Sequence, residues 1–352
     1  MTTALPVAFY QTRSLEDVAA IAAGGGGYLI TVEHTRELAA SALDVPSEKT
    51  VWRFWKPNGE GAGFREASHG SVILPVSLAV VMTLGNRRLT AAALGNRPVP
   101  GYLLSWNAKD ADPPQLEETI ASHAVLALDP GEAAKVHLRP RDDWSTLALP
   151  ASEWLFHPSL ASLPGGAGVA FAADTADGRA VVWISEGTGA PRMVASVPAA
   201  LNPVVARVAG KRCLLYRRMP ADWSVYRHDP RHSGSFGPIA LPLAMTDLEP
   251  GAGAHPIDLS KDHGLGGVFD FAAAGDGDRL VLAAIGGTEA APVLRVSVGS
   301  IAAGAPVLKY SAALHGVPER VTLAVTDAGA LIGLAYKNER GFDLEGAVVP
   351  LR

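Results

Sequence analysis

Short apolar runs of about five to nine residues recur along the whole chain, and each is bounded by Gly, Pro, Asp or Asn. Within these runs the apolar residues either alternate with polar ones or are continuous, and both patterns are typical of β-strands. Stripes with the 3.6-residue period of a helix are scarce; the best helical candidates are Leu15–Ala23 and Thr35–Leu43. The pattern therefore predicts an all-β chain with two short helices at most.

The clearest group of strands lies late in the chain. Val268–Ala273 is followed by a turn at Gly275–Asp278, and Arg279–Ile285, Val293–Val298 and Val307–Ser311 complete a set of four. Four consecutive strands joined by tight turns make one blade of a β-propeller. Similar sets recur at a spacing of roughly 50 residues, which is the range of propeller repeats. The sequence therefore predicts a β-propeller.

The last set of strands is one strand short. Arg320–Thr326, Ala330–Lys337 and Leu344–Leu351 provide three strands, whereas Pro6–Gln11 is a strand of the right length with no set of its own. We expect Pro6–Gln11 to pair as the outer strand of the last blade, because closure of the ring removes exposed sheet edges.

The number of sets favours seven blades, with six or eight as alternatives, because the third set is short and the first is poorly patterned. The expected blades of this single domain, residues 1–352, are approximately 12–60, 68–120, 121–153, 154–199, 200–250, 262–314, and 315–352 with 6–11. Four sets contain a short Gly- or Asp-containing hairpin, as at Gly85-Asn86 and Ala209-Gly210. No Trp-Asp or kelch signature repeats, so the sequence predicts an architecture but no family.

Composition and charge limit the classes of molecule that the chain is expected to bind. The chain is 48% hydrophobic and 18% charged, with 37 Gly and 26 Pro, as suits many short strands and tight turns. A net charge of −5 and the lack of a Lys/Arg-rich run do not support a nucleic-acid partner. The longest apolar stretch, Val72–Leu84, contains Pro75 and is shorter than the roughly 20 residues of a membrane span. We expect a cytoplasmic protein that binds a small molecule or a protein partner.

Several histidines precede the expected innermost strands of successive blades, where loops converge on the channel mouth. They are His69, His123, His157, His263 and His315. Converging imidazoles would bind a divalent transition metal, with His69, His123, His157 and His263 as ligands. His123 and His263 would then be the catalytic groups of a lyase, isomerase or cyclase. Ordinary histidine usage, ten in the chain, is the alternative explanation, and no other cofactor is indicated.

Cationic and aromatic residues gather in a second segment. They are Arg217, Arg218, Trp223, Tyr226, Arg227 and His228. Guanidinium groups match carboxylates and phosphates, and aromatic faces stack on rings, so this segment predicts a site for an anionic ligand. Ordinary packing of arginine stems over aromatic rings is the alternative. A ligand- or partner-binding propeller is therefore the first function expected, and the histidine-dependent enzyme is the second.

Three further features indicate structure more than chemistry. Arg139–Trp144 reads as a solvated turn, and Gly24–Gly27 is not a phosphate loop because Tyr28–Val32 continues as a strand. The single cysteine, Cys213, lies in an apolar run and is expected to be a buried thiol.

Overall fold

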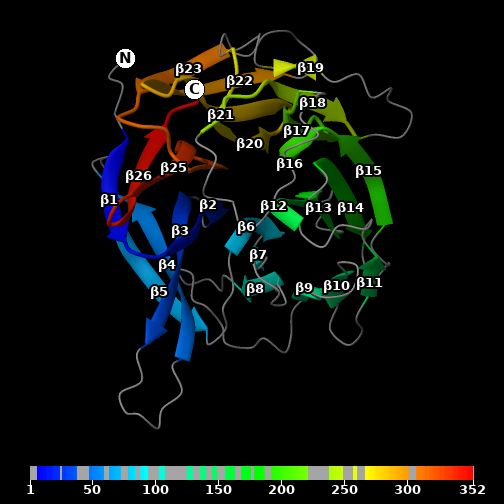
Figure 1. Ribbon diagram of the computed structural model, residues 1–352, viewed down its shortest axis with the longest axis horizontal. Helices are drawn as coiled ribbons and strands as arrows, with labels where there is room; N and C mark the ends of the chain where they lie inside the picture. Colours follow the sequence, from blue (N-terminus) through cyan, green and yellow to red (C-terminus); the bar gives the residue numbers. More distant parts are fainter. Residues whose placement is uncertain are drawn as a thin grey trace.

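The computed structural model describes the chain in eighteen segments. They are residues 6–23, 26–37, 47–58, 63–72, 78–84, 88–93, 103–107, 125–129, 135–139, 145–148, 155–162, 168–175, 178–186, 192–220, 238–248, 257–259, 266–300 and 307–351. These residues form strands β1 to β26 in seven antiparallel sheets (Figure 1). Within them, no helix is long and apolar enough to cross a membrane.

Each sheet follows the chain. The first has β2 (Leu15–Ala23), β3 (Gly26–Glu37), β4 (Ser47–Pro57) and β5 (Phe64–Val72); the second has β6 (Leu78–Leu84), β7 (Arg88–Ala93) and β8 (Leu103–Asn107); the third has β9 (Val125–Asp129), β10 (Lys135–Arg139) and β11 (Ser145–Ala148). The fourth has β12 (Leu155–Ser162), β13 (Gly168–Thr175), β14 (Arg179–Glu186) and β15 (Arg192–Pro198); the fifth has β16 (Ala200–Val208), β17 (Lys211–Arg218), β18 (Leu243–Asp247) and β19 (Ile257–Asp258). The sixth has β20 (Asp270–Asp276), β21 (Arg279–Thr288), β22 (Ala291–Ser300) and β23 (Val307–Ala313); the last has β24 (Arg320–Thr326), β25 (Gly329–Asn338), β26 (Gly341–Val349) and β1 (Val7–Thr12).

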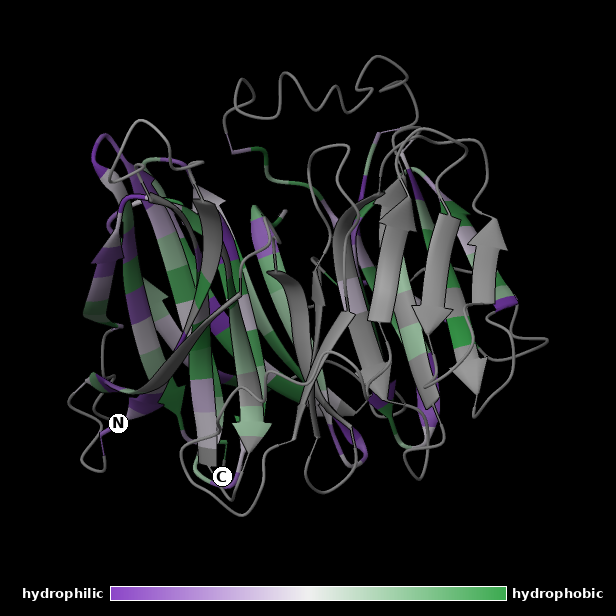
Figure 2. Ribbon diagram, turned by 90° about the horizontal axis from the view of Figure 1, so that it is seen from below, coloured by the Kyte–Doolittle hydropathy of each residue, from purple (hydrophilic) through white to green (hydrophobic). Residues whose placement is uncertain are grey.

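Six of the seven sheets stand around a centre with their first strands innermost, whereas the third sheet continues outward from the second (Figure 1). Strands β2, β6, β12, β16, β20 and β24 contact one another in that cyclic order, whereas β9 contacts β8. Viewed from the side, the strands run along the ring axis, and hydrophobic positions concentrate within the strands (Figure 2). The predicted all-β propeller is confirmed. The number of blades stays a prediction, because the described residues form seven sheets but only six first strands contact one another around the centre.

Strand β1 lies at the outer edge of the last sheet. It pairs antiparallel with β26, from Val7 opposite Gly346 to Thr12 opposite Phe342. The register shifts between Ala8 and Tyr10. The last sheet therefore consists of the three C-terminal strands and the N-terminal strand β1. It packs against the first sheet.

The prediction of a helix at Leu15–Ala23 is wrong, because this segment is strand β2 and pairs with β3 along its length. Alanine favours helices in isolation, but tertiary packing overrides propensity. Val18, Ala19 and Ala20 are buried at the centre of the ring, where neighbouring sheets approach closely. The second helical candidate begins inside β3, which extends to Glu37, and its remainder lies outside the described residues.

Two strand assignments also differ from those expected. Residues Phe64–Val72 form β5 at the outer edge of the first sheet, although the first blade is expected to end near residue 60. In the fourth sheet the innermost strand is β12, whereas the apolar pattern of the sequence predicts that the following segment, which forms β13, is innermost. Pro158 interrupts the pattern of β12, and the register shifts between Phe156 and Ser159.

Side chains link the innermost strands of neighbouring sheets, which do not pair through their backbones in a ladder. Ser159 Oγ accepts the Val205 N–H (3.0 Å), Asp270 Oδ2 accepts the Val321 N–H (2.8 Å), and Thr322 Oγ1 accepts the Ala20 N–H (2.8 Å). Buried backbone N–H groups require acceptors. Here side-chain oxygens accept the hydrogen bonds that the carbonyl groups of a paired strand accept within a sheet.

Cys213 lies in the apolar core between the fifth and sixth sheets, and only 3% of its surface is exposed. Burial raises the pKa of its thiol to about 12. Since the thiolate is the reactive form, we expect a disulfide-exchange reagent such as DTNB to label no cysteine in the native protein and one in denaturant. Rapid labelling of the native protein would contradict this burial.

Candidate functional site

Half of the predicted histidine site, and most of the predicted anionic-ligand site, lies outside the part of the chain that the structure describes. His123, His263, Trp223, Tyr226, Arg227 and His228 belong to segments that are not described. His69 lies within β5, the outermost strand of the first sheet, and precedes innermost strand β6 along the chain; the apolar run that follows it divides between β5 and β6. His157 lies within innermost strand β12 rather than before it. The metal site remains a prediction.

The structure separates Arg217 from Arg218. The Arg217 guanidinium donates to the carbonyls of Ile239 (3.3 Å) and Phe269 and to Asn202 Oδ1 (3.1 Å). Arg218 is 46% exposed, and its guanidinium lies 3.8 Å from Asp258 Oδ2. Successive residues of a strand point to opposite faces. Arg217 therefore holds neighbouring segments together, and the two arginines do not face one common ligand.

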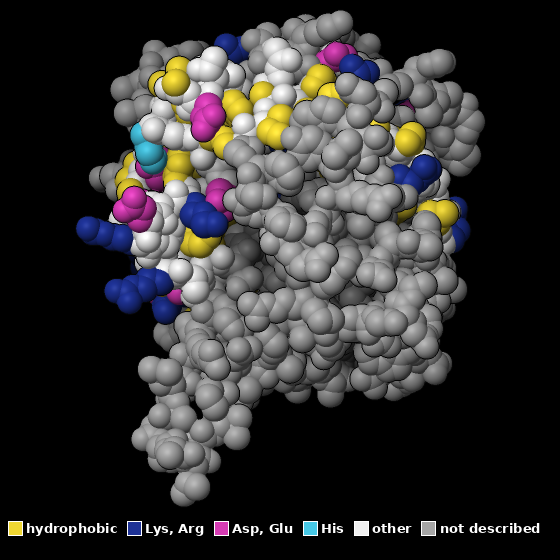
Figure 3. Space-filling view, in the orientation of Figure 1, with side chains coloured by type: hydrophobic (Ala, Val, Ile, Leu, Met, Phe, Trp, Pro, Cys, Tyr) yellow, Lys and Arg dark blue, Asp and Glu magenta, His cyan; other side chains and the backbone are white. Residues whose placement is uncertain are grey.

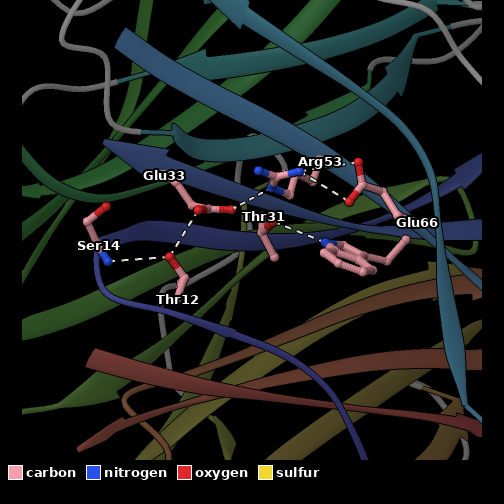
Figure 4. Close-up of polar contacts among 7 residues, drawn as sticks. Thr12, Ser14, Thr31, Glu33, Arg53 and Glu66 are labelled. Carbon is pink, nitrogen blue, oxygen red and sulfur yellow. Dashed lines mark hydrogen bonds and ion pairs between the residues drawn. The ribbon is translucent and has the colours of Figure 1, made fainter. Parts of the chain in front are cut away.

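The best-defined polar group lies where the closing strand β1 meets the first sheet. Tyr10 and Thr12 come from β1, Glu33 from β3, Arg53 from β4 and Glu66 from β5; these five residues are called the seam cluster. Figure 4 shows Thr12, Glu33, Arg53 and Glu66. Its position follows from strand register. Thr31 pairs with Arg53, so the alternate residue Glu33 and the Arg53 side chain extend from the same face of the sheet.

The Arg53 guanidinium bridges a buried and a surface carboxylate. Its Nε donates to Glu33 Oε1 at 3.1 Å, and its Nη1 donates to Glu66 Oε1 and Oε2 at 3.3 and 3.2 Å. Glu33 also accepts a 2.9 Å hydrogen bond from Thr12 Oγ1. The Glu33 side chain is 7% exposed, whereas those of Arg53 and Glu66 are 28% and 32% exposed. The cluster therefore has a fixed base and a solvent-facing edge.

Aromatic rings form the wall beside the guanidinium. Arg53 Cζ lies 5.7 Å from the Tyr10 ring centroid, and that ring packs on Trp55 at 4.5 Å. Trp55 is itself fixed, because its Nε1 donates to Thr31 Oγ1 at 3.1 Å (Figure 4). Burial, and after it the Glu33 carboxylate, raises the pKa of Tyr10. The phenol therefore remains protonated at neutral pH and is able to donate a hydrogen bond.

The seam cluster is absent from the candidates that the sequence indicates. Its members are spread from Tyr10 to Glu66 and meet only through strand pairing and closure by β1. One signal was present in the sequence: Thr31 interrupts the apolar run Tyr28–Val32, and Glu33 follows at the alternate position. Such residues on a buried face need partners, which identifies them as members of a polar network.

No family model matches the chain, and no curated protein matches its sequence. Solved structures with a similar arrangement include AofleA from Arthrobotrys oligospora, at 12% identity over 88% of this chain and 92% of that one, with a TM-score of 0.44. SapL1 lectin in complex with alpha methyl fucoside has 10% identity over 97% and 98%, with a TM-score of 0.45. BBS1N in complex with ARL6DN has 10% identity over 99% and 96%, with a TM-score of 0.47. With every TM-score below 0.5, the sheet topology described above, and not these likenesses, establishes the propeller.

Proposed function

We propose that this protein is a ligand-binding β-propeller whose seam cluster binds a small, uncharged molecule rich in hydroxyl groups, of the carbohydrate or polyol class. The observation that carries the proposal is the partly exposed Arg53 guanidinium, held between two carboxylates beside an aromatic wall. A hydroxyl group both donates to a carboxylate and accepts from a guanidinium, and hydrogen bonds to charged groups are the strong ones.

The balance of charge supports a neutral ligand. Arg53 contributes one positive charge, and Glu33 and Glu66 contribute two negative charges, so the cluster carries a net charge of −1. An anionic ligand would meet these carboxylates at short range. On the face seen in Figure 3, Lys and Arg lie interspersed with Asp and Glu over the described residues, which gives that surface mixed charge.

The position of the cluster also supports binding. Arg13 and Ser14 lead from β1, the outermost strand of one sheet, into β2, the innermost strand of the next. Loops of this kind lie at one end of the ring, where propellers carry their working groups. The Ser14 N–H is directed to Thr12 Oγ1 at 3.4 Å, which ties this loop to the cluster.

The test is ligand-observed NMR with a panel of neutral monosaccharides and polyols, followed by calorimetry with any that bind. Arg53→Lys retains the charge but loses the planar fork, and we expect it to weaken binding by about tenfold, or ~1.4 kcal/mol. Glu66→Gln replaces the solvent-facing carboxylate by a neutral amide, which is a weaker hydrogen-bond acceptor, and should weaken binding by roughly five- to tenfold. Each variant is first checked for native circular dichroism.

Arg65→Lys is the matched control, because Arg65 is an exposed neighbour of Glu66 on the same strand. Its affinity should equal that of the wild type. Unchanged affinity in Arg53→Lys, or binding of anionic sugars in preference to neutral ones, would show that the seam cluster is only a structural closure of the ring.

A further inference from the structure

Strand β1 has fewer buried residues than the strands that it joins. None of its six residues is buried, and Val7, Ala8 and Gln11 are exposed. In its partner β26 four residues are buried, and in the next strand, β25, eight are buried. Segments with few buried contacts open locally while the rest of a protein stays folded. Opening of β1 would leave the pairing of β24, β25 and β26 intact.

The aromatic side chains of β1 contact the first sheet, whereas its backbone pairs with the last one. The centroid of the Phe9 ring lies 5.3 Å from that of Trp55 and 5.0 Å from that of Phe64. The Tyr10 ring lies 4.5 Å from Trp55 and packs beside the Arg53 guanidinium. Strand β1 therefore joins two sheets, and its opening would remove these rings from the first sheet.

One hydrogen bond joins β1 to the buried base of the seam cluster. Thr12 Oγ1 donates to Glu33 Oε2 at 2.9 Å, while Arg53 Nε donates to the other oxygen, Oε1, at 3.1 Å (Figure 4). With a donor on each oxygen, the Glu33 carboxylate has a fixed orientation, and it holds the Arg53 guanidinium in turn. A threonine hydroxyl has a single hydrogen, so the donation to Glu33 uses all of its donor capacity.

We propose that β1 opens and recloses as a unit on the folded ring, and that its closure assembles the seam cluster, with Thr12 as the positioning residue. When β1 is open, Glu33 lacks the Thr12 hydroxyl and Arg53 lacks the Tyr10 ring beside it. A ligand that binds the assembled cluster therefore stabilises the closed strand. Only this consequence for a ligand rests on the function proposed above.

The test is hydrogen–deuterium exchange of the full chain, followed by mass spectrometry of peptides from β1 and β25. After correction for intrinsic rates, we expect β1 to exchange roughly tenfold faster than β25, or more, through local opening. Thr12→Val should increase opening of β1 by about tenfold, because it removes a hydrogen bond to a charged group, and should leave β25 unchanged. Thr12→Ser retains the hydroxyl and should exchange as the wild type does. Thr288→Val, the same replacement at an exposed site of the sixth sheet, should leave β1 unchanged.

Assembly of the cluster is measured at the Arg53 Nε–H, which donates to a carboxylate that is only 7% exposed. In 15N–1H NMR spectra, we expect exchange of this proton with water to accelerate in Thr12→Val by the same factor as exchange of β1. Thr12→Ser should again match the wild type. If Thr12 only stabilised β1, the replacement would change exchange of β1 and leave that of Arg53 unaltered.

Exchange of β1 together with β25, or an unaltered Arg53 proton in Thr12→Val, would overturn the proposal. Sorbitol is the ligand probe. At about ten times its dissociation constant it should slow the opening of β1 about tenfold and leave β25 unchanged. Sorbitol that binds without slowing β1 would also contradict the proposal. Failure of sorbitol to bind would count against the polyol ligand alone, because the exchange of β1 and of Arg53 is measured without it.

Discussion

Replacing Asp270 by Ala is expected to lower the free energy of unfolding by about 3–4 kcal/mol, because it removes the carboxylate that accepts two buried hydrogen bonds and so links three sheets. Asp270 is 5% exposed; its Oδ2 accepts the Val321 N–H at 2.8 Å, and its Oδ1 accepts from Asn202 Nδ2 at 3.4 Å. Without the carboxylate, a buried backbone N–H of β24 and the amide of Asn202 lose their acceptor. Urea unfolding followed by circular dichroism measures the loss.

Asp270→Asn is the graded control for this prediction. The amide retains one oxygen that is able to accept the Val321 N–H, but it loses the charge and one of the two acceptor oxygens. We expect a smaller loss, about 1–2 kcal/mol. A change below about 0.5 kcal/mol in Asp270→Ala would mean that the three innermost strands do not depend on this side chain.

Gly275→Ala is expected to cost about 3 kcal/mol, because the new methyl group would overlap the backbone of the neighbouring sheet. A Cβ at residue 275 would lie 1.7 Å from the Arg207 carbonyl oxygen and 2.8 Å from its carbonyl carbon. The close approach is part of a turn-to-turn contact, since the Ala209 N–H donates to the Gly277 carbonyl at 2.8 Å. Backbone atoms on both sides cannot move aside as a flexible side chain does.

Gly316→Ala is the matched control, because a Cβ there meets no atom within 4 Å and its backbone needs no positive φ. We expect its stability to remain within about 0.5 kcal/mol of the wild type. Thermal unfolding of both variants provides the comparison. If Gly275→Ala melts together with Gly316→Ala, the fifth and sixth sheets do not approach each other as described.

The late sheets could be predicted almost strand by strand, because turns with demanding backbone geometry separate their strands. Ala209 and Gly210 adopt φ values of 51° and 78°, which belong to the two-residue hairpin that joins β16 and β17. Gly277 likewise adopts a positive φ, in the turn that the sequence predicts at Gly275–Asp278. Where such turn residues separate two apolar runs, they fix the ends of both strands, so the boundaries can be predicted from the local sequence.

The innermost strands were harder to predict, for a physical reason. Strand β2 is buried and rich in alanine, so it has neither the alternation of a half-exposed strand nor bulky β-branched residues throughout. The seam cluster could not be predicted for a different reason, because its residues come from separate sheets. Thr12 and Glu33 are 21 positions apart, and they meet only once β2 has paired with β3 and placed Leu15 opposite Glu33.

Because β1 pairs with β26, the first strand to be synthesised cannot complete its backbone pairing until the last strand has been made. Gln11 and Asp343 are hydrogen-bonded across 332 positions of sequence, so the ribosome makes β1 long before its partner exists. At roughly 5–20 residues per second, this delay is about 20–60 s. During that interval the hydrogen-bonding edge of β1 has no strand to pair with, although Trp55, on which the rings of Phe9 and Tyr10 pack, is made early. The ring therefore closes only after translation of the last strand, and a nascent chain stalled before Gly341 should present β1 to chaperones and proteases.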